Sequence, residues 1–352
     1  MGDDLQKITA KEEDEGELPP IFWQTITILT WSGYMLSIFL IGKWAEANNI
    51  IPLPGKLQVL IFTFAAGLSF VMLFTIFESA AAIFAMNGQL GLAMVACKIS
   101  VNIHRALSAK SADYARQLGL MADIYLMQDN LKAAEKSARK ALKVYESFED
   151  ARDKAIKHSD KNAALAASLA MASHHQIIEP LCHETLASVH IKREEWQKAI
   201  DEAKFAIKKL ELLNQDTPEG PIKTEGGSPE DMLMLKIAQQ PKKRGLQGGQ
   251  QALASSLLVL GEAYNGQSMP MEAKAVLNRA LKIREEVSKD APYRAAEVHL
   301  ELAHSATLDD EPESARKHRE RARELALKQP CFLSSLVLNK LGVALPKAPG
   351  KD

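Results

Sequence analysis

The chain has 352 residues, 43 Lys and Arg against 44 Asp and Glu, and three cysteines. Its near-neutral charge lacks the clustered basic face of a nucleic-acid-binding protein. Cys97, Cys182 and Cys331 are too widely spaced for a disulfide framework or a paired-cysteine metal knuckle, and they favour a reducing compartment. The length allows about two or three domains.

Residues 1–20 carry seven acidic residues and two lysines. A block of acids at a chain terminus is typical of a solvated segment, so we expect an acidic disordered tail over residues 1–20. A cleavable signal peptide is not expected, because this region is acidic and no short apolar core ending in small residues follows it.

Two uncharged runs follow the tail, at residues 21–42 (IFWQTITILTWSGYMLSIFLIG) and 57–77 (LQVLIFTFAAGLSFVMLFTIF). Each has roughly the length that a helix needs to cross about 30 Å of hydrocarbon. Pro52, Pro54 and Gly55 lie between them and turn the chain back. The sequence therefore predicts a transmembrane helical hairpin within a membrane domain of residues 21–97.

Small residues lie one helical turn apart in both runs. The pairs are Gly33 and Ser37 in the first run, and Ala65 and Ser69 in the second. Small residues at this spacing let membrane helices approach closely. We expect these four residues to mediate transmembrane packing, either between the two spans or between copies of the chain.

An apolar continuation from Ala80 to Ala96 is broken at Asn87, Gly88 and Gln89. It could extend the second span, lie at the interface or form a third span. Glu78 has no ionisable neighbour in sequence, which favours an interfacial position over a role in ion transfer.

Two spans would place both termini on one side of the membrane. The basic residues that flank the second span favour the cytoplasmic side. The expected location is an integral membrane protein of plasma- or inner-membrane type, with a cytoplasmic soluble domain.

Beyond about residue 100 the chain consists of alanine-rich segments of helical period. Four of them align without gaps: 121–142, 186–207, 260–281 and 302–323. The second position of each is small: Ala122, Ala187, Gly261 and Ala303. Alanine recurs twelve residues later, at Ala134, Ala199, Ala273 and Ala315, and seven residues after that, at Ala141, Ala206, Ala280 and Ala322.

This register resembles the tetratricopeptide repeat. The bulky position of the repeat's first helix holds Tyr125, His190 and Tyr264, although the fourth unit has Ala306. Polar and proline residues predict the turns between paired helices at 129–131, 194–196, 268–270 and 310–312. The resemblance implies an all-α fold: a tetratricopeptide-like α-solenoid of about four to five hairpins over residues 105–335, with a C-terminal tail at 336–352. An alanine-rich helical bundle is the alternative.

The spacing of the units is irregular. They begin at residues 121, 186, 260 and 302, whereas a regular period is about 34 residues. The first gap could hold a degenerate hairpin or longer helices over 132–157. The second gap holds an insertion, 214–251, rich in glycine, proline and glutamine. Within it, Ser228 and Pro229 predict the start of a short helix that stops by Pro241.

No phosphate loop, dinucleotide-binding fingerprint, zinc-protease helix or nucleophile elbow is present in the sequence. His174, His175, Cys182, His183 and His190 form one cluster of candidate metal ligands. Their seven-residue spacing and the intervening Pro180 disfavour a metal site. We therefore expect no enzyme activity, no cofactor and no metal.

In the family, the first helices of stacked hairpins line a concave face that binds peptides or helices. Mapped onto this chain, that face comprises Arg116, Asp123, Glu184, Ser188, Ser255, Glu262, Asn265, Glu297, His304 and Thr307. The resemblance implies a membrane-anchored scaffold or adaptor whose partners are a protein or peptide in this groove and the lipid bilayer.

A structural subunit of a larger membrane complex, packed through the hydrophobic hairpin against other subunits or further copies, is the alternative. An enzyme or transporter component ranks third, and nucleic acid is not an expected partner.

Overall fold

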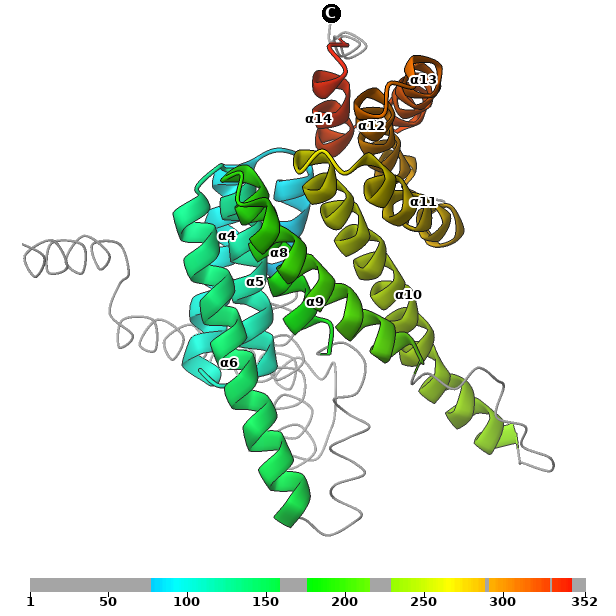
Figure 1. The fold of residues 1–352 in the computed structure, drawn as a ribbon. Coiled ribbons are helices and arrows are strands. Elements are labelled where there is room, and N and C mark those ends of the chain that lie inside the picture. Colours follow the sequence, from blue (N-terminus) through cyan, green and yellow to red (C-terminus); the bar gives the residue numbers. More distant parts are fainter. Residues whose placement is uncertain (1–76, 159–175, 216–228, 289–290, 330, 344–352) are drawn as a thin grey trace, which may run out of the picture.

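The computed structural model describes residues 77–158, 176–215, 229–288, 291–329 and 331–343 (Figure 1). All regular elements of these residues are helices. A helix at Phe77–Met86 is followed by α4 (Leu90–Leu107), α5 (Ala112–Met127), α6 (Leu131–His158), α8 (Ile178–Lys192), α9 (Trp196–Gln215), α10 (Pro229–Gly266), α11 (Pro270–Val287), α12 (Pro292–Leu308), α13 (Pro312–Lys328) and α14 (Phe332–Lys340).

The four predicted helix turns close with one backbone pattern. In the first, the Asn130 N–H donates to the Tyr125 carbonyl at 2.9 Å and the Asp129 N–H to the Leu126 carbonyl at 3.1 Å. This pair of bonds is the Schellman motif, which requires a residue in the left-handed region. That residue has φ between 54° and 62° in all four turns, at Asp129, Glu194, Ser268 and Asp310. The predicted turn positions are confirmed.

The small-residue columns lie between the paired helices. Every alanine of the three columns has an exposed fraction of 2 % or less. Gly261 stands where the other units have alanine, because a Cβ there would lie 2.5 Å from the Leu277 side chain. The helix pairs α5–α6, α8–α9, α10–α11 and α12–α13 are therefore hairpins in the predicted register.

A further hairpin with the same register precedes these four. Gly88, at φ 74°, closes its turn, and the Gln89 N–H donates to the Phe84 carbonyl at 2.8 Å. The columns continue through it at Ala81, Ala93 and Ser100, all fully buried. The Phe77–Met86 helix and α4 thus pair as a repeat unit, and the domain boundary expected at residue 97 falls inside α4.

The long-helix alternative for the first gap is confirmed as far as α6 extends, to His158. The helix start predicted at Pro229 is also confirmed. The predicted stop at Pro241 is wrong, because α10 continues to Gly266. An interior proline costs a helix about 3 kcal/mol, which is the physical reason that the sequence predicts a stop there.

The helices form two layers. The first helices contact one another in sequence, as α5–α8, α8–α10, α10–α12 and α12–α14, and each second helix packs between its own partner and the next first helix. Between the second helices of the described units, contacts are few or absent. The first helices therefore make the continuous inner layer of a solenoid, as Figure 1 shows from α5 to α14. Helix α14 crosses residue 336, the expected start of the C-terminal tail.

Within the described part of the chain, α4 is the one helix long and apolar enough to span a membrane. Its mean hydropathy is 1.2 over 18 residues, and 33 % of it is buried in the protein. The predicted break at Asn87–Gln89 is confirmed, and α4 packs against α5, which carries Asp113, Arg116 and Asp123.

The predicted spans at 21–42 and 57–77 lie outside the described residues, apart from Phe77. So do the acidic tail at 1–20 and the four expected packing residues, Gly33, Ser37, Ala65 and Ser69.

We expect Gly261→Ala to lower the free energy of unfolding by about 1–3 kcal/mol, because the new methyl group overpacks the hairpin against Leu277. Helix propensity alone predicts a gain of about 1 kcal/mol. Gly119→Ala on α5 is the matched control, because its Cβ would meet only the Cys182 Sγ, at 3.7 Å; it should stabilise the chain. Urea unfolding of the full-length chain in detergent, followed by circular dichroism, checks both. Equal stabilisation by the two variants would contradict the packing argument.

Candidate functional site

Side-chain hydrogen bonds join the first helix of one hairpin to the first helix of the next. The Thr185 hydroxyl on α8 donates to Asp123 Oδ1 on α5 at 2.6 Å. The Ser256 hydroxyl on α10 donates to Glu184 Oε2 on α8 at 2.8 Å. A carboxylate on one inner helix thus accepts from a hydroxyl on the following one at both junctions.

The other junctions of the inner layer are also polar. The Ser305 hydroxyl on α12 donates to Asn265 Oδ1 on α10 at 2.7 Å. At the N-terminal end, the Arg116 guanidinium on α5 donates to both carboxylate oxygens of Glu78, with Nη2 2.8 Å from Oε2. Glu78 therefore has an ionic partner 38 residues away, which its local sequence does not reveal.

Four of the ten predicted partner-binding residues take part in bonds of this kind. Arg116, Asp123, Glu184 and Asn265 each contact the neighbouring inner helix. Ser255 accepts from Arg284 Nη2 at 2.5 Å, and the Ser188 hydroxyl donates to the Glu184 carbonyl at 3.1 Å. The structure places these side chains within and between repeats, and whether they also contact a partner stays a prediction.

Two of the bridging carboxyls have strongly shifted pKa values. Burial raises the pKa of Asp123 to about 6, against the opposing hydrogen bond from Thr185. Burial also raises the pKa of Glu184 to about 7; the bond from Ser256 opposes this shift, and the charge of Asp123 adds to it. The two shifts bring these carboxyl groups toward neutral pH, because removal from water disfavours the charged form.

A groove of about 640 Å³ opens where the α8–α9 turn meets α10, α12 and the end of α14. We call it the C-terminal groove. Its lining mixes apolar and charged side chains from several repeat units and comprises Ile191, Trp196, Glu262, Gly266, Leu300, Glu301, Ala303, His304, Thr307, Arg319, Lys340 and Leu341. A smaller hollow of about 210 Å³ shares Glu262, Leu300, Glu301 and Lys340 with it and reaches Glu297.

The groove and the hollow beside it bring together four of the predicted partner-binding residues: Glu262, Glu297, His304 and Thr307. Sequence reasoning missed the others. Trp196 was noted only as a turn residue, and Lys340 falls in the expected tail.

Trp196 packs closely on α10 because Gly266 has no side chain; a Cβ there would lie 2.4 Å from the indole ring. Gly266 follows Tyr264, which occupies the bulky position of the third unit, by two residues. This glycine is the sequence signal that could have indicated the contact with Trp196.

Charge in the groove is mixed and tightly coupled. Glu301 lies 3.8 Å from both His304 Nδ1 and Lys340 Nζ. Burial pushes the pKa of Glu301 up, but the ion pair with His304 and the charge of Lys340 together lower it. The pKa of His304 is raised by its bond to Glu301. Glu301 therefore ionises more readily than an isolated glutamate.

The pKa of Glu262 is shifted in the opposite direction from that of Glu301. Burial first, and the charge of Glu301 second, raise its pKa to about 6. Its carboxyl group forms no hydrogen bond or ion pair with any of the residues that the structure describes. The groove thus presents one carboxyl group that its own fold does not satisfy.

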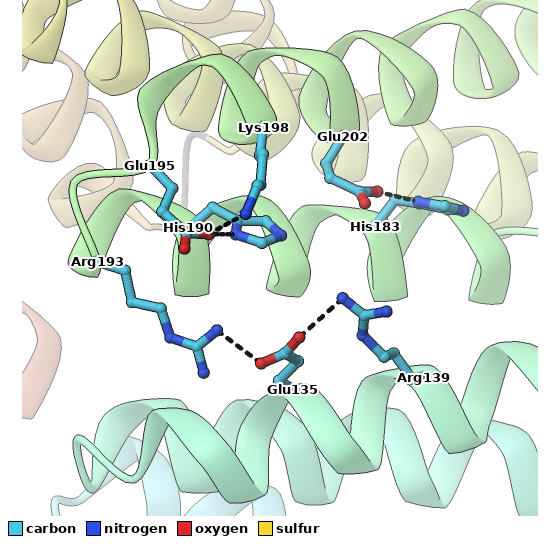
Figure 2. A network of polar contacts seen from close by, with 8 residues as sticks. All are labelled: Glu135, Arg139, His183, His190, Arg193, Glu195, Lys198 and Glu202. Carbon is cyan, nitrogen blue, oxygen red and sulfur yellow. Dashed lines mark hydrogen bonds and ion pairs between the residues drawn. The ribbon is translucent and has the colours of Figure 1, made fainter.

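A second polar site lies between α6 and the α8–α9 hairpin (Figure 2). Glu135 on α6 accepts from Arg193 at 2.7 Å and from Arg139 at 2.8 Å. On the facing hairpin, His190 Nδ1 lies 2.5 Å from Glu195, which also pairs with Lys198 at 3.2 Å. These groups satisfy one another, so the network connects two repeats and leaves no charge free for a ligand.

The cluster of candidate metal ligands is divided in the structure. His183 and His190 each pair with a glutamate through Nδ1, at 2.5 Å. Cys182 is buried, and burial raises its pKa to about 12. His174 and His175 lie outside the described residues. Across those residues, no group of three or more His, Cys, Asp or Glu side chains could hold a metal ion.

No protein-family model matches the sequence, and no curated protein matches it either. Among solved structures, the chain is similar to a protein from Podosopora anserina that is described as a kinesin light chain with nearly identical TPR-like repeats. One crystal structure of that protein has 14 % identity and a TM-score of 0.40, over 72 % of this chain and 94 % of that one. A second has 14 % identity and a TM-score of 0.38, over 72 % and 95 %.

BtubC (BKLC) from P. vanneervenii is also similar, with 15 % identity and a TM-score of 0.37 over 75 % of this chain and 96 % of that one. Because these TM-scores are low, the fold of this chain rests on its own helix register and packing.

We expect Glu184→Gln to stabilise the chain at pH 8 by roughly 2 kcal/mol and to change little at pH 5. A carboxyl group with a raised folded-state pKa contributes its full stability below its unfolded pKa and loses it as the pH rises through about 7. Glutamine stays neutral and can still accept from Ser256. Urea unfolding at both pH values measures the difference.

Glu146→Gln, at an exposed position on α6, is the control and should have no effect at either pH. A Glu184→Gln effect of equal size at pH 5 and pH 8 would disprove the titration.

Proposed function

We propose that this chain is a membrane-anchored tetratricopeptide-like scaffold that holds a protein partner in its C-terminal groove. The observation that carries the proposal is the unsatisfied Glu262 carboxyl group inside that groove, beside apolar surface from Leu300 and Leu341. Glu262 is half-buried, so its carboxyl group has lost part of its water, and a basic group on a bound partner would give it a hydrogen-bonded ion pair.

The lining defines the chemistry of the partner. Glu262, Glu297 and Glu301 supply three carboxyl groups. Lys340 and His304 form ion pairs with Glu301, and their charges also act on Glu262. A partner segment with a lysine or arginine next to an apolar side chain complements this arrangement. The basic group would pair with Glu262, and the apolar side chain would lie against Leu300 and Trp196.

The anchor is the hydrophobic region of residues 21–77. Two uncharged runs of spanning length, joined by a proline-containing turn, support a transmembrane hairpin that holds the solenoid at the membrane surface. The proposed location is an integral membrane protein with the repeats on the cytoplasmic side. Gly33, Ser37, Ala65 and Ser69 are proposed as the packing residues of the spans.

We expect Glu262→Arg to abolish partner capture while leaving the fold intact, because it reverses the charge of the unpaired group. A photo-crosslinking amino acid at the exposed Thr307 would be introduced into the full-length chain in cells, followed by detergent extraction and mass spectrometry. The expected result is a defined adduct that is lost at least about tenfold in Glu262→Arg, as for a lost buried charge pair.

Glu285→Arg, at an exposed position on α11, is the matched charge-reversal control and should keep the adduct. Unchanged capture by Glu262→Arg would count against the groove. If the adducts instead survive Glu262→Arg and vanish when residues 21–77 are exchanged for an unrelated two-span anchor, the chain acts as a subunit packed through its membrane hairpin.

A further inference from the structure

The first hairpin has an apolar outer surface where the later hairpins carry mostly charged residues. On α4, Leu92 and Val95 are 53 % and 56 % exposed, and Ile99 follows them on the same helix face. We call these three residues the outer stripe of α4. Their spacing of three and four residues places them on one side of the helix.

The shared register allows a comparison position by position. The residues equivalent to Val95 are Lys136, Asp201, Ala275 and Lys317, all exposed. Those equivalent to Ile99 are Lys140, Phe205, Arg279 and Arg321. Six of these eight residues are charged, as expected for the solvent-facing positions of a soluble array. The outer stripe of α4 therefore departs from the pattern of its own repeat.

The charged residues of α4, Lys98 and Arg105, are both basic. From Gln89 to Ala112 the sequence contains Lys98, Arg105 and Lys110 and no acidic residue, whereas α6, α9, α11 and α13 all carry acids. Lys98 is exposed and borders the outer stripe. A helix with an apolar face, basic residues and no acids is the pattern of an interfacial helix on anionic lipid.

The hairpin geometry places the stripe near the proposed anchor. Phe77 ends the second hydrophobic run and begins the first helix of the hairpin. Phe77 and Ile99 are equally far from Gly88 along the two antiparallel helices of the first hairpin. Ile99 is therefore level with Phe77, the end of the second hydrophobic run. The chain that leaves the proposed anchor thus brings the Ile99 end of the outer stripe back toward the membrane surface, with Val95 and Leu92 about one and two helical turns farther along the hairpin.

We infer that the outer stripe of α4 lies on the surface of an anionic lipid bilayer and orients the solenoid against it. This inference rests on the proposed membrane anchoring and adds a second contact between the chain and lipid. The occupant is the bilayer rather than another protein, because the stripe combines apolar residues with an excess of basic ones next to the lipid anchor.

Depth-dependent fluorescence tests the inference. The full-length Cys331→Ser chain, whose remaining cysteines are buried, would carry Val95→Cys labelled with an environment-sensitive dye. Matched labels at Lys136→Cys and Asp201→Cys occupy the equivalent outer positions of the next two hairpins. All three sites are exposed, so the label should not disturb the fold.

In vesicles of phosphatidylcholine and phosphatidylglycerol, the Val95 label should emit at shorter wavelength and be quenched at least about twofold by brominated lipid, as expected for a shallow interfacial helix. The labels at 136 and 201 should behave as in water. Quenching of the Val95 label should fall in vesicles of phosphatidylcholine alone.

Co-flotation with the vesicles at alkaline pH separates the two proposals. A chain that does not float lacks the anchor, and both proposals fail. A chain that floats with a water-exposed Val95 label overturns the interfacial contact alone. A Val95 label that is shielded from water but not quenched by brominated lipid would show that protein covers the stripe. Equal quenching of this label in vesicles of phosphatidylcholine alone would show that the basic residues play no part. Either result overturns the inference.

Discussion

In every hairpin of this solenoid, the close approach of two helices through small side chains is the constraint on which the rest depends. The columns that run through Ala122, Ala134 and Ala141 leave no space for a larger group, and Gly261 shows the limit, because even a methyl group would collide with Leu277. Alanines bury little apolar area each, so one hairpin gains little free energy from its own interface. Stability comes from stacking hairpins on their neighbours, which is how repeat proteins build a continuous core.

Stacking determines what the inner layer can do. Where first helices contact each other, Asp123 and Glu184 accept hydrogen bonds across the junctions. These carboxyl groups connect repeats, and their partial burial raises their pKa values toward neutrality. Where the inner layer of the described helices ends, at the short α14, the C-terminal groove opens. Glu262 is left there without a partner in the described part of the fold.

The two ends of the solenoid therefore differ in chemistry. The C-terminal end offers a groove with carboxyl groups beside apolar walls. The N-terminal end, which follows directly from the hydrophobic region, offers Leu92 and Val95 on the outside of α4. A scaffold fixed at its first hairpin and open at its last would hold a partner as far from the bilayer as the array allows.

Much of the repeat could be predicted from the sequence, because its determinants are local. The turns at Asp129, Glu194, Ser268 and Asp310 follow from residues that end one helix and start the next, and the alanine columns follow from spacing alone. The same logic extends to Ala81 and Ala93, although the apolar character of that region suggested a membrane segment instead. Hydropathy could not distinguish the two, because a hairpin at the end of a solenoid and a helix in lipid both expose apolar side chains.

Tertiary structure alone decided which polar residues face neighbours and which face the groove. Arg116 and Glu262 occupy the same predicted concave face. Yet Arg116 pairs with Glu78 from the preceding hairpin, whereas burial and the like charge of Glu301 keep the pKa of Glu262 high. The continuation of α10 past Pro241 to Gly266 likewise goes against the local preference for a stop. Sequence determined the register of each hairpin, since that depends on contacts within about 30 residues; the groove depends on how successive hairpins stack, which no local pattern specifies.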